Sequence, residues 1–178
     1  MKKKKGAIEY FISTLIITTV ILLIVTGLRV RKLDMINNFV SDGLVSANLA
    51  SDIINLDKFG ATREINISDS NNAYNLFYEA LKTNLKLNKK SNNEDLIIDN
   101  KVNVDDFIIY NVTNNNVEVI TIKPTYSRYV TKLNNLKTPS GVTIKTTSVY
   151  SKISFKVKEI LGEKKVSKAC TTDITTRR

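Results

Sequence analysis

The strongest pattern in the chain is an apolar run near its N-terminus, which predicts a membrane-spanning helix. Residues Ala7 to Leu28 read AIEYFISTLIITTVILLIVTGL and contain one charged side chain, that of Glu9. At about 1.5 Å per residue, a helix of this length covers roughly 33 Å, which is enough to cross the hydrocarbon core of a bilayer. Many of the residues are β-branched, but lipid favours a helix because backbone groups must there pair within the chain.

A cleaved secretory signal peptide is the main alternative for this segment. Such a peptide has a shorter apolar core, which is followed by a cleavage site with small residues. Here the run is too long, and it ends in Gly27-Leu28-Arg29-Val30-Arg31-Lys32 without an Ala-x-Ala site. We therefore expect an uncleaved single-pass anchor.

Beyond the apolar run, the spacing of hydrophobic residues predicts that the helix continues. Apolar side chains recur every three or four positions, which marks one buried face. They are Leu33, Ile36, Val40, Leu44, Ala47 and Ile54. Polar residues such as Asp42, Asn48 and Asp52 are assigned to the other face. The helix is expected to reach about Leu56, with a possible kink at Gly43, and to pack on a sheet; a short coiled-coil stalk is the alternative.

A second helix is predicted from about Asn71 to Leu87. Asp69 or Ser70 can cap its N-terminus, because short polar side chains accept hydrogen bonds from the first free backbone N–H groups. Its apolar stripe consists of Ala73, Leu76, Phe77, Ala80, Leu81 and Leu85.

The C-terminal half has the pattern of β-strands. Segments 106–112 and 117–122 flank an asparagine turn and predict a hairpin. A turn at Pro139-Ser140-Gly141 precedes a long alternating stretch over 142–161, and Gly162 turns the chain into a last strand over 165–175. The predicted fold class is therefore α+β: an N-terminal transmembrane helix extending into a long amphipathic helix, a second short helix, and a four- to five-stranded antiparallel sheet.

Within the long alternating stretch, one register is rich in lysine. Lys152, Ser154, Lys156 and Lys158 share the even positions, so they are expected to line the outer face. Lysines at these positions would discourage edge-to-edge pairing if the strand lies at an edge of the sheet.

The distribution of charge indicates the orientation of the anchor. The formal net charge is +10. A tail with Lys2, Lys3, Lys4 and Lys5 is expected to stay in the cytoplasm, although basic residues also follow the apolar run. The expected organisation is a cytoplasmic basic tail (1–6), a transmembrane helix (7–28) and an extracytoplasmic α+β domain (29–178) at the cell membrane. Positive charges outside the tail are scattered, so nucleic acid is not an expected partner. Membrane lipid is an expected partner, because the predicted apolar helix spans the bilayer.

Several kinds of chemistry lack the residues that they need. The chain has no His and a single Cys, Cys170. A metal site built on imidazole or thiolate is therefore not expected, nor is a catalytic unit of Ser or Cys with His. No glycine-rich phosphate loop is present. We expect no catalytic, cofactor-binding or metal-binding residues, no cofactor, no small-molecule substrate and no enzymatic activity.

Polar residues within the apolar run are candidates for contacts between membrane helices. The hydroxyls of Ser13, Thr14, Thr18 and Thr19 permit close packing against a neighbouring helix, or they bond back to carbonyls of their own helix. Glu9 has two interpretations as well. It lies near the membrane interface and is favoured at a helix N-terminus, or it pairs with a positive group of a neighbouring subunit.

The order Lys-Lys-Gly6-Ala-Ile-Glu9-Tyr10-Phe, followed by a continuous apolar helix, resembles the start of type IV pilins. More closely, it resembles the TadE-like pseudopilins of bacterial tight-adherence (Tad/Flp) systems, in which a basic tip and a glycine precede a glutamate and an aromatic residue. Segments 148–162 and 165–169 resemble the closing hairpin of TadE-like ectodomains. The resemblance implies that Gly6, Glu9 and Tyr10 take part in processing or assembly. In the family, the glutamate pairs with the new N-terminal amine of a neighbour.

The spacing of the motif differs from the usual prepilin peptidase site. That site has glycine directly before the cut and glutamate five residues after it, whereas Glu9 lies three residues after Gly6. Keeping the usual distance to Glu9 places the cut between Lys4 and Lys5. Processing by such a peptidase therefore stays open.

Two functions follow from these observations. The first is a membrane-anchored minor pilin-like subunit that contributes to assembly of a Tad or type IV pilus-like secretion apparatus. Its partners would be other pilin-like subunits or assembly-platform membrane proteins. The alternative is a membrane-tethered extracytoplasmic binding or sensory module, encoded on a mobile element, whose helix serves for attachment alone. Dependence of assembly on Glu9 distinguishes the two.

Overall fold

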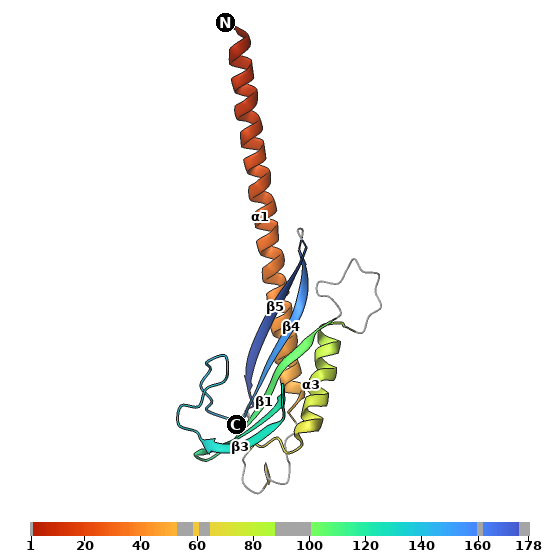
Figure 1. Cartoon of the computed structure of the whole chain (residues 1–178), viewed down its shortest axis with the longest axis vertical. Helices are drawn as coiled ribbons and strands as arrows, with labels where there is room; N and C mark the ends of the chain where they lie inside the picture. The colour runs from red at the N-terminus through yellow and green to blue at the C-terminus, as the bar shows by residue number, and fades with distance from the viewer. Residues whose placement is uncertain (1, 53–58, 61–64, 88–100, 160–161, 175–178) are drawn as a thin grey trace. The chain divides into compact units, whose positions relative to one another are not determined.

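A computed structural model of the chain describes residues 2–52, 59–60, 65–87, 101–159 and 162–174 (Figure 1). The chain divides into two compact units, Met1–Asn38 and Phe39–Arg178. The elements within the described residues are helices α1 (Lys2–Ala50) and α3 (Ser70–Asn84) and strands β1 (Asn103–Thr113), β2 (Asn116–Lys123), β3 (Ser127–Lys132), β4 (Ser148–Glu159) and β5 (Gly162–Asp173). All strand pairs are antiparallel, in the order β3-β2-β1-β4-β5. The predicted α+β fold class is confirmed.

Helix α1 ends at Ala50, several residues before the predicted end near Leu56. Its last turn tightens, since the Ser51 N–H bonds to the carbonyls of Ala47 and Asn48 at 3.3 and 3.2 Å. Residues 53–58 lie outside the described part of the chain, so the remainder of that prediction is not assessed.

The final turns of α1 and helix α3 cover one face of the sheet. Val40, Leu44 and Ala47, which share the predicted apolar stripe, are fully buried. The structure gives Gly43 a packing role, because a Cβ there would lie 2.7 Å from Cδ2 of Leu85, the residue that follows α3. Glycine thus permits the close approach of α1 to the end of α3.

Helix α3 begins where the sequence predicts. The Asp69 carboxylate accepts a hydrogen bond from the Asn72 N–H at 3.0 Å, so Asp69, one of the two predicted candidates, is the N-cap. Phe77 packs on Phe107 of β1 with ring centroids 4.7 Å apart. Leu76, which the sequence assigned to the apolar stripe, stays 37% exposed.

A buried polar contact joins α1 to the sheet, and it corrects the assignment of Asn48 to the outer face of the helix. Asn48 is fully buried. Its Oδ1 accepts a hydrogen bond from the Ser151 hydroxyl of β4 at 2.7 Å, and its Nδ2 donates to Thr172 Oγ1 of β5 at 3.1 Å. A buried amide is tolerated here because the neighbouring strands β4 and β5 both supply partners.

Replacing Asn48 with alanine is expected to lower the free energy of unfolding by roughly 1–3 kcal/mol, since the hydroxyls of Ser151 and Thr172 would lose a buried partner. Urea unfolding of the full chain in detergent micelles, followed by tyrosine fluorescence, measures this change. Ser46→Ala is the matched control, because Ser46 is exposed on the same helix. An equal effect of both substitutions would contradict a structural role for Asn48.

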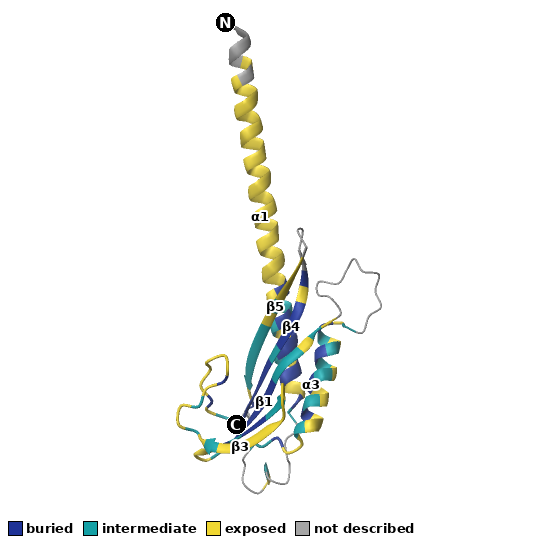
Figure 2. Ribbon diagram, in the orientation of Figure 1, coloured by how far each residue is buried: buried dark blue, intermediate teal, exposed yellow. Residues whose placement is uncertain are grey.

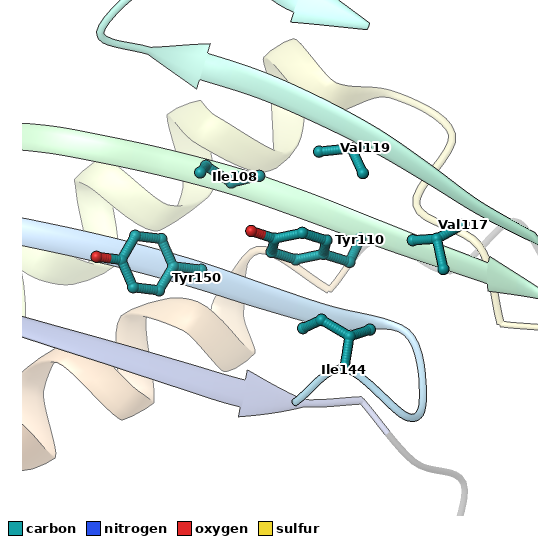
Figure 3. Close-up of a cluster of buried hydrophobic side chains, with 6 residues drawn as sticks. All are labelled: Ile108, Tyr110, Val117, Val119, Ile144 and Tyr150. Atoms are coloured by element: carbon teal, nitrogen blue, oxygen red, sulfur yellow. The ribbon is translucent and has the colours of Figure 1, made fainter. Parts of the chain in front are cut away.

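A second core lies on the opposite face of the sheet (Figure 3). Its buried residues are Ile108, Tyr110, Val117, Val119, Ile144 and Tyr150. Ile144 comes from the irregular segment between β3 and β4, as do Leu133 and Leu136, which pack against this cluster. The sheet therefore has helices on one face and an irregular segment on the other.

The structure corrects the prediction for Ser154, one of the even positions of β4. Ser154 is 3% exposed and donates to Asp105 Oδ1 at 3.0 Å, so it does not belong to an outer polar face. Lys152 is half-buried and Lys156 is exposed, whereas the side chain of Lys158 lies outside the described part. Moreover, β4 pairs with both β1 and β5, so it is not an edge strand.

Ionisation of Tyr110 gives the domain a specific alkaline sensitivity. Burial, assisted by nearby Tyr129, Tyr150 and Asp106, raises the pKa of Tyr110 from 10.0 to about 12. Above pH 10 the unfolded chain releases this proton while the folded chain retains it, so stability present below pH 10 falls as the pH rises towards 12. Tyr110→Phe should reduce the loss of unfolding free energy between pH 9 and 11.5 by about 2 kcal/mol. Urea unfolding followed by circular dichroism tests this, and an unchanged pH dependence would contradict it.

Candidate functional site

The candidate site is the first part of α1. Residues 8–35 of this helix are all exposed, although most of those up to Leu28 are apolar. Figure 2 shows this continuous exposed surface. Within the described residues, one helix, running from Ile8 to Ala50, is long and apolar enough to cross a membrane. An uninterrupted apolar surface of this length is costly in water, so the helix needs lipid or other helices around it.

The hydroxyls of the apolar segment all bond within their own helix. Each donates to the carbonyl four residues earlier, at 2.7–2.9 Å. The donors are Ser13, Thr14, Thr18, Thr19 and Thr26. Of the two alternatives for these hydroxyls, bonding back to carbonyls of their own helix is therefore the one observed. It allows the hydroxyls to enter lipid without an unpaired hydrogen. Their small size and their oxygen lone pairs stay available to a neighbouring helix.

The residues at the head of the helix share one face. With 3.6 residues per turn, Gly6, Glu9, Tyr10 and Ser13 fall within about 100° of one another around the axis. Glu9 is exposed, and its carbonyl accepts the Ser13 hydroxyl at 2.9 Å. Tyr10 is 79% exposed. A Cβ at Gly6 would meet no atom within 4 Å, so nothing within the described chain requires glycine at that position.

The threonines lie on a different side of the helix from Glu9. Thr14, Thr18 and Thr19 line a shallow hollow with Phe11 and Leu15. The predicted polar positions therefore form two surfaces, a glutamate face and a threonine hollow. Sequence reasoning did not include Phe11 and Leu15, although their four-residue spacing places them on the same side as Thr18. Lys2 to Lys5 belong to α1, but their side chains lie outside the described part of the chain.

A second hollow lies in the domain formed by residues 39–178. It has a volume of about 540 Å³, and lysines from three elements and from the segment before β1 line it: Lys82, Lys101, Lys156 and Lys165. The Lys82 ammonium lies 4.1 Å from the centroid of the Tyr78 ring, a cation–π contact. The Lys156 ammonium pairs with Glu163 at 2.9 Å.

Asn111 holds a connecting segment against the sheet. Its Oδ1 accepts the Ile67 N–H at 2.9 Å and its Nδ2 donates to the Ile67 carbonyl at 3.0 Å, so the side chain replaces a β-bridge. Asn111 also belongs to the pattern Asn-Val-Thr, which fits N-glycosylation. It is 3% exposed and fully engaged, which makes it a structural residue in the folded chain.

The described residues offer few groups that could bind a metal or react as a thiol. Among the described residues, no three His, Cys, Asp or Glu side chains gather closely enough to hold a metal ion. Cys170 is half-buried on β5, with its Sγ 3.7 Å from Thr172 Oγ1. The absence of a cofactor and of an enzymatic activity stays a prediction from the sequence.

Comparison of the chain with protein-family models, with curated proteins and with solved structures found no match.

Proposed function

We propose that the chain is a membrane-anchored minor pilin-like subunit, a pseudopilin, which contributes to assembly of a Tad or type IV pilus-like secretion apparatus. The observation that carries this proposal is the head of α1. Glu9 is an exposed carboxylate two turns into a helix that is otherwise apolar over the length of a bilayer. The same helix continues into the domain and ends buried against a five-stranded antiparallel sheet.

A helix that serves only for membrane attachment does not need this carboxylate. A charge within the membrane segment costs roughly 2.5–3.5 kcal/mol on insertion scales when it lies at the helix centre, and less near the interface. Pairing with a positive group of a neighbouring helix offsets that cost. In the proposed mechanism, subunits pack side by side in the membrane through their apolar helices, with Glu9 selecting the partner and the register.

The proposal includes a location. The chain spans the cell membrane once, the tail with Lys2 to Lys5 is cytoplasmic, and the domain that follows the helix is extracytoplasmic. The partners are other pilin-like subunits or assembly-platform membrane proteins, in contact with membrane lipid.

Co-purification from native membranes tests the proposed function. Tagged full-length chain, solubilised in mild detergent after brief cross-linking, should recover proteins that themselves begin with an apolar helix headed by an acidic residue. A matched control is an unrelated single-pass protein with a tail of four lysines, expressed at the same level. Recovery of the same proteins by the control, or of none by the chain, would contradict the proposal.

The mass of the mature chain shows whether the proposed subunit is processed by cleavage or remains an unprocessed anchor. Cleavage after Gly6 gives a chain that begins at Ala7, and cleavage at the usual distance from Glu9 gives one that begins at Lys5. An intact Met1 or Lys2 excludes the processed version and leaves an unprocessed pilin-like anchor. In that version the partner of Glu9 is a side-chain cation, because no new N-terminal amine arises next to the membrane.

The lysine-lined hollow favours a second candidate, a membrane-tethered binding or sensory module. Four lysines around an open hollow suit an anionic ligand better than a neutral one. In that case substitution of Lys82 and Lys165 would impair function while Glu9→Ala would not. The opposite result supports the pilin-like subunit.

A further inference from the structure

We propose that β3 is a self-pairing edge, through which two copies of this chain join their sheets in antiparallel register centred on Tyr129. β3 is one of the two outer strands of the sheet. Its residues are exposed apart from Thr131. Figure 2 colours most of the strand as exposed. Tyr129 is 51% exposed and Val130 67% exposed, although aromatic and β-branched residues are those that strand pairing favours.

Both edges of the sheet carry basic residues. Edge strands usually avoid pairing through lysines, prolines or bulges. β5, the other outer strand, carries Lys164, Lys165 and Lys168, and β3 carries Arg128 and Lys132. On β3, the guanidinium of Arg128 forms an ion pair with Glu118 of the adjacent strand, with an Nε–Oε1 distance of 2.7 Å. That ion pair holds the Arg128 guanidinium beside Glu118, and the charges of Arg128 and Lys132 limit the registers that a further strand can adopt.

The residue after β3 shows which residues of the strand direct their backbone N–H and C=O groups towards β2. The Leu133 N–H donates to the Asn115 carbonyl at 2.9 Å, which continues the ladder between β2 and β3. Because hydrogen-bonded pairs alternate along an antiparallel ladder, Thr131 and Tyr129 also direct their backbone groups towards β2. Arg128 and Val130 therefore direct theirs outward, where a further strand would bind.

Charge then selects a single register for a second copy. Outward-facing residues must meet outward-facing residues. A register centred on Arg128 places the two Arg128 side chains opposite each other, and one centred on Val130 places Arg128 opposite Lys132. Like charges at directly opposed positions are destabilising. Registers centred nearer either end of β3 pair fewer residues.

The register centred on Tyr129 avoids these conflicts. It places Arg128 opposite Val130, and Lys132 opposite Tyr126, the residue directly before β3, which permits a cation–π contact. Tyr129 meets its own copy at a position without backbone hydrogen bonds, where Cα atoms are about 4.5 Å apart and side chains are closest. Ser127 meets Thr131, a pair of hydroxyls. The strand is thus complementary to itself, and a second copy of this chain is the occupant that fits it.

Cysteine cross-linking of the full chain in detergent micelles tests this register. In a Cys170→Ser background, Tyr129→Cys should form a disulfide with its copy, since a separation of about 4.5 Å suits that bond. The expected yield of dimer is at least about tenfold above that of Ser127→Cys or Thr131→Cys alone. A mixture of the Ser127→Cys and Thr131→Cys chains should form the mixed dimer. A maximum at Arg128→Cys or Val130→Cys, equal yields everywhere, or no dimer would overturn the proposal.

A proline substitution provides the matched control. Val130→Pro, combined with Tyr129→Cys, removes an outward N–H, so it should abolish the dimer and leave the urea midpoint of the monomer nearly unchanged. Thr131→Pro removes a bond to β2 and should lower that midpoint. If Val130→Pro unfolds the domain instead, the Val130 N–H points towards β2 rather than outward, and the proposal fails. The pairing does not depend on the proposed function, because purified chain suffices and Glu9 has no part in it.

Discussion

The Glu9→Ala chain should enter the membrane normally and lose its pilin-like partners. Removing a carboxylate from an apolar helix lowers the cost of insertion, so resistance to carbonate extraction should match that of the wild type. Loss of one member of a buried ion pair costs about 3–5 kcal/mol, which corresponds to a roughly 100-fold or greater loss of affinity. Quantitative mass spectrometry of co-purified proteins from native membranes measures the effect.

Two further variants identify the cause of that loss. Glu9→Gln retains the shape and the hydrogen bonds but not the charge, so it should also fail if an ion pair is the essential contact. Ser13→Ala lies one turn further along the glutamate face, and its hydroxyl already bonds to the carbonyl of Glu9 at 2.9 Å. This variant should assemble like the wild type. Normal assembly of Glu9→Ala would remove the main support for a pilin-like function.

The Phe77→Ala chain should lose about 3–5 kcal/mol of stability, the range found when a buried aromatic side chain is truncated. Phe77 is fully buried between α3 and the sheet, 4.7 Å from Phe107 between ring centroids, and Tyr74 packs edge-on against Phe107 at 5.4 Å. The cavity would remove one aromatic neighbour from each of these two rings. Because domains of this size are stable by about 5–15 kcal/mol, the loss is large enough to populate unfolded chain.

Urea unfolding in detergent micelles measures this loss, with tyrosine fluorescence as the signal because the chain has seven Tyr and no Trp. Leu76→Ala is the matched control: it truncates the adjacent residue of the same helix, whose side chain is 37% exposed. The expected cost there is below about 1 kcal/mol. Similar losses for the two variants would contradict the placement of α3 on the sheet.

Periodicity identified most of the elements and the apolar stripe of α1. Val40, Leu44 and Ala47 are buried as their spacing predicts, and Asp69 caps α3. These features depend on residues within one or two turns of each other, so a single sequence contains all the information. The same reasoning located the hairpin of β1 and β2, because two segments rich in β-branched and aromatic residues flank a short turn.

Asn48 shows where such reasoning fails. A polar residue beside an apolar stripe is assigned to solvent unless its partner is known, and its partner Ser151 is 103 positions away in the sequence. The prediction for Ser154 was wrong for a similar reason. The second core needs Ile144, which comes from an irregular segment without periodicity, so the burial of both faces of β4 could not be foreseen.

The candidate site was predicted in part. The apolar run and the positions of Glu9 and Tyr10 follow directly from the sequence, as does the shared face that a helix gives them. The bonding of the hydroxyls was open, and backbone geometry resolved it, since each carbonyl four residues earlier is within reach. The strand β3 was not located, because Ser127–Lys132 lacks an alternation of apolar and polar residues.

The most direct test of the central claim, that the helix headed by Glu9 is an assembly surface, is photo-cross-linking from Tyr10. An aromatic photoreactive residue replaces Tyr10 with little change of shape, next to Glu9 and 79% exposed. In native membranes, irradiation should link the chain to a second protein through that protein's own apolar N-terminal helix, and Glu9→Ala should abolish the product. Labelling of lipid alone, or a product that persists in Glu9→Ala, would contradict the account.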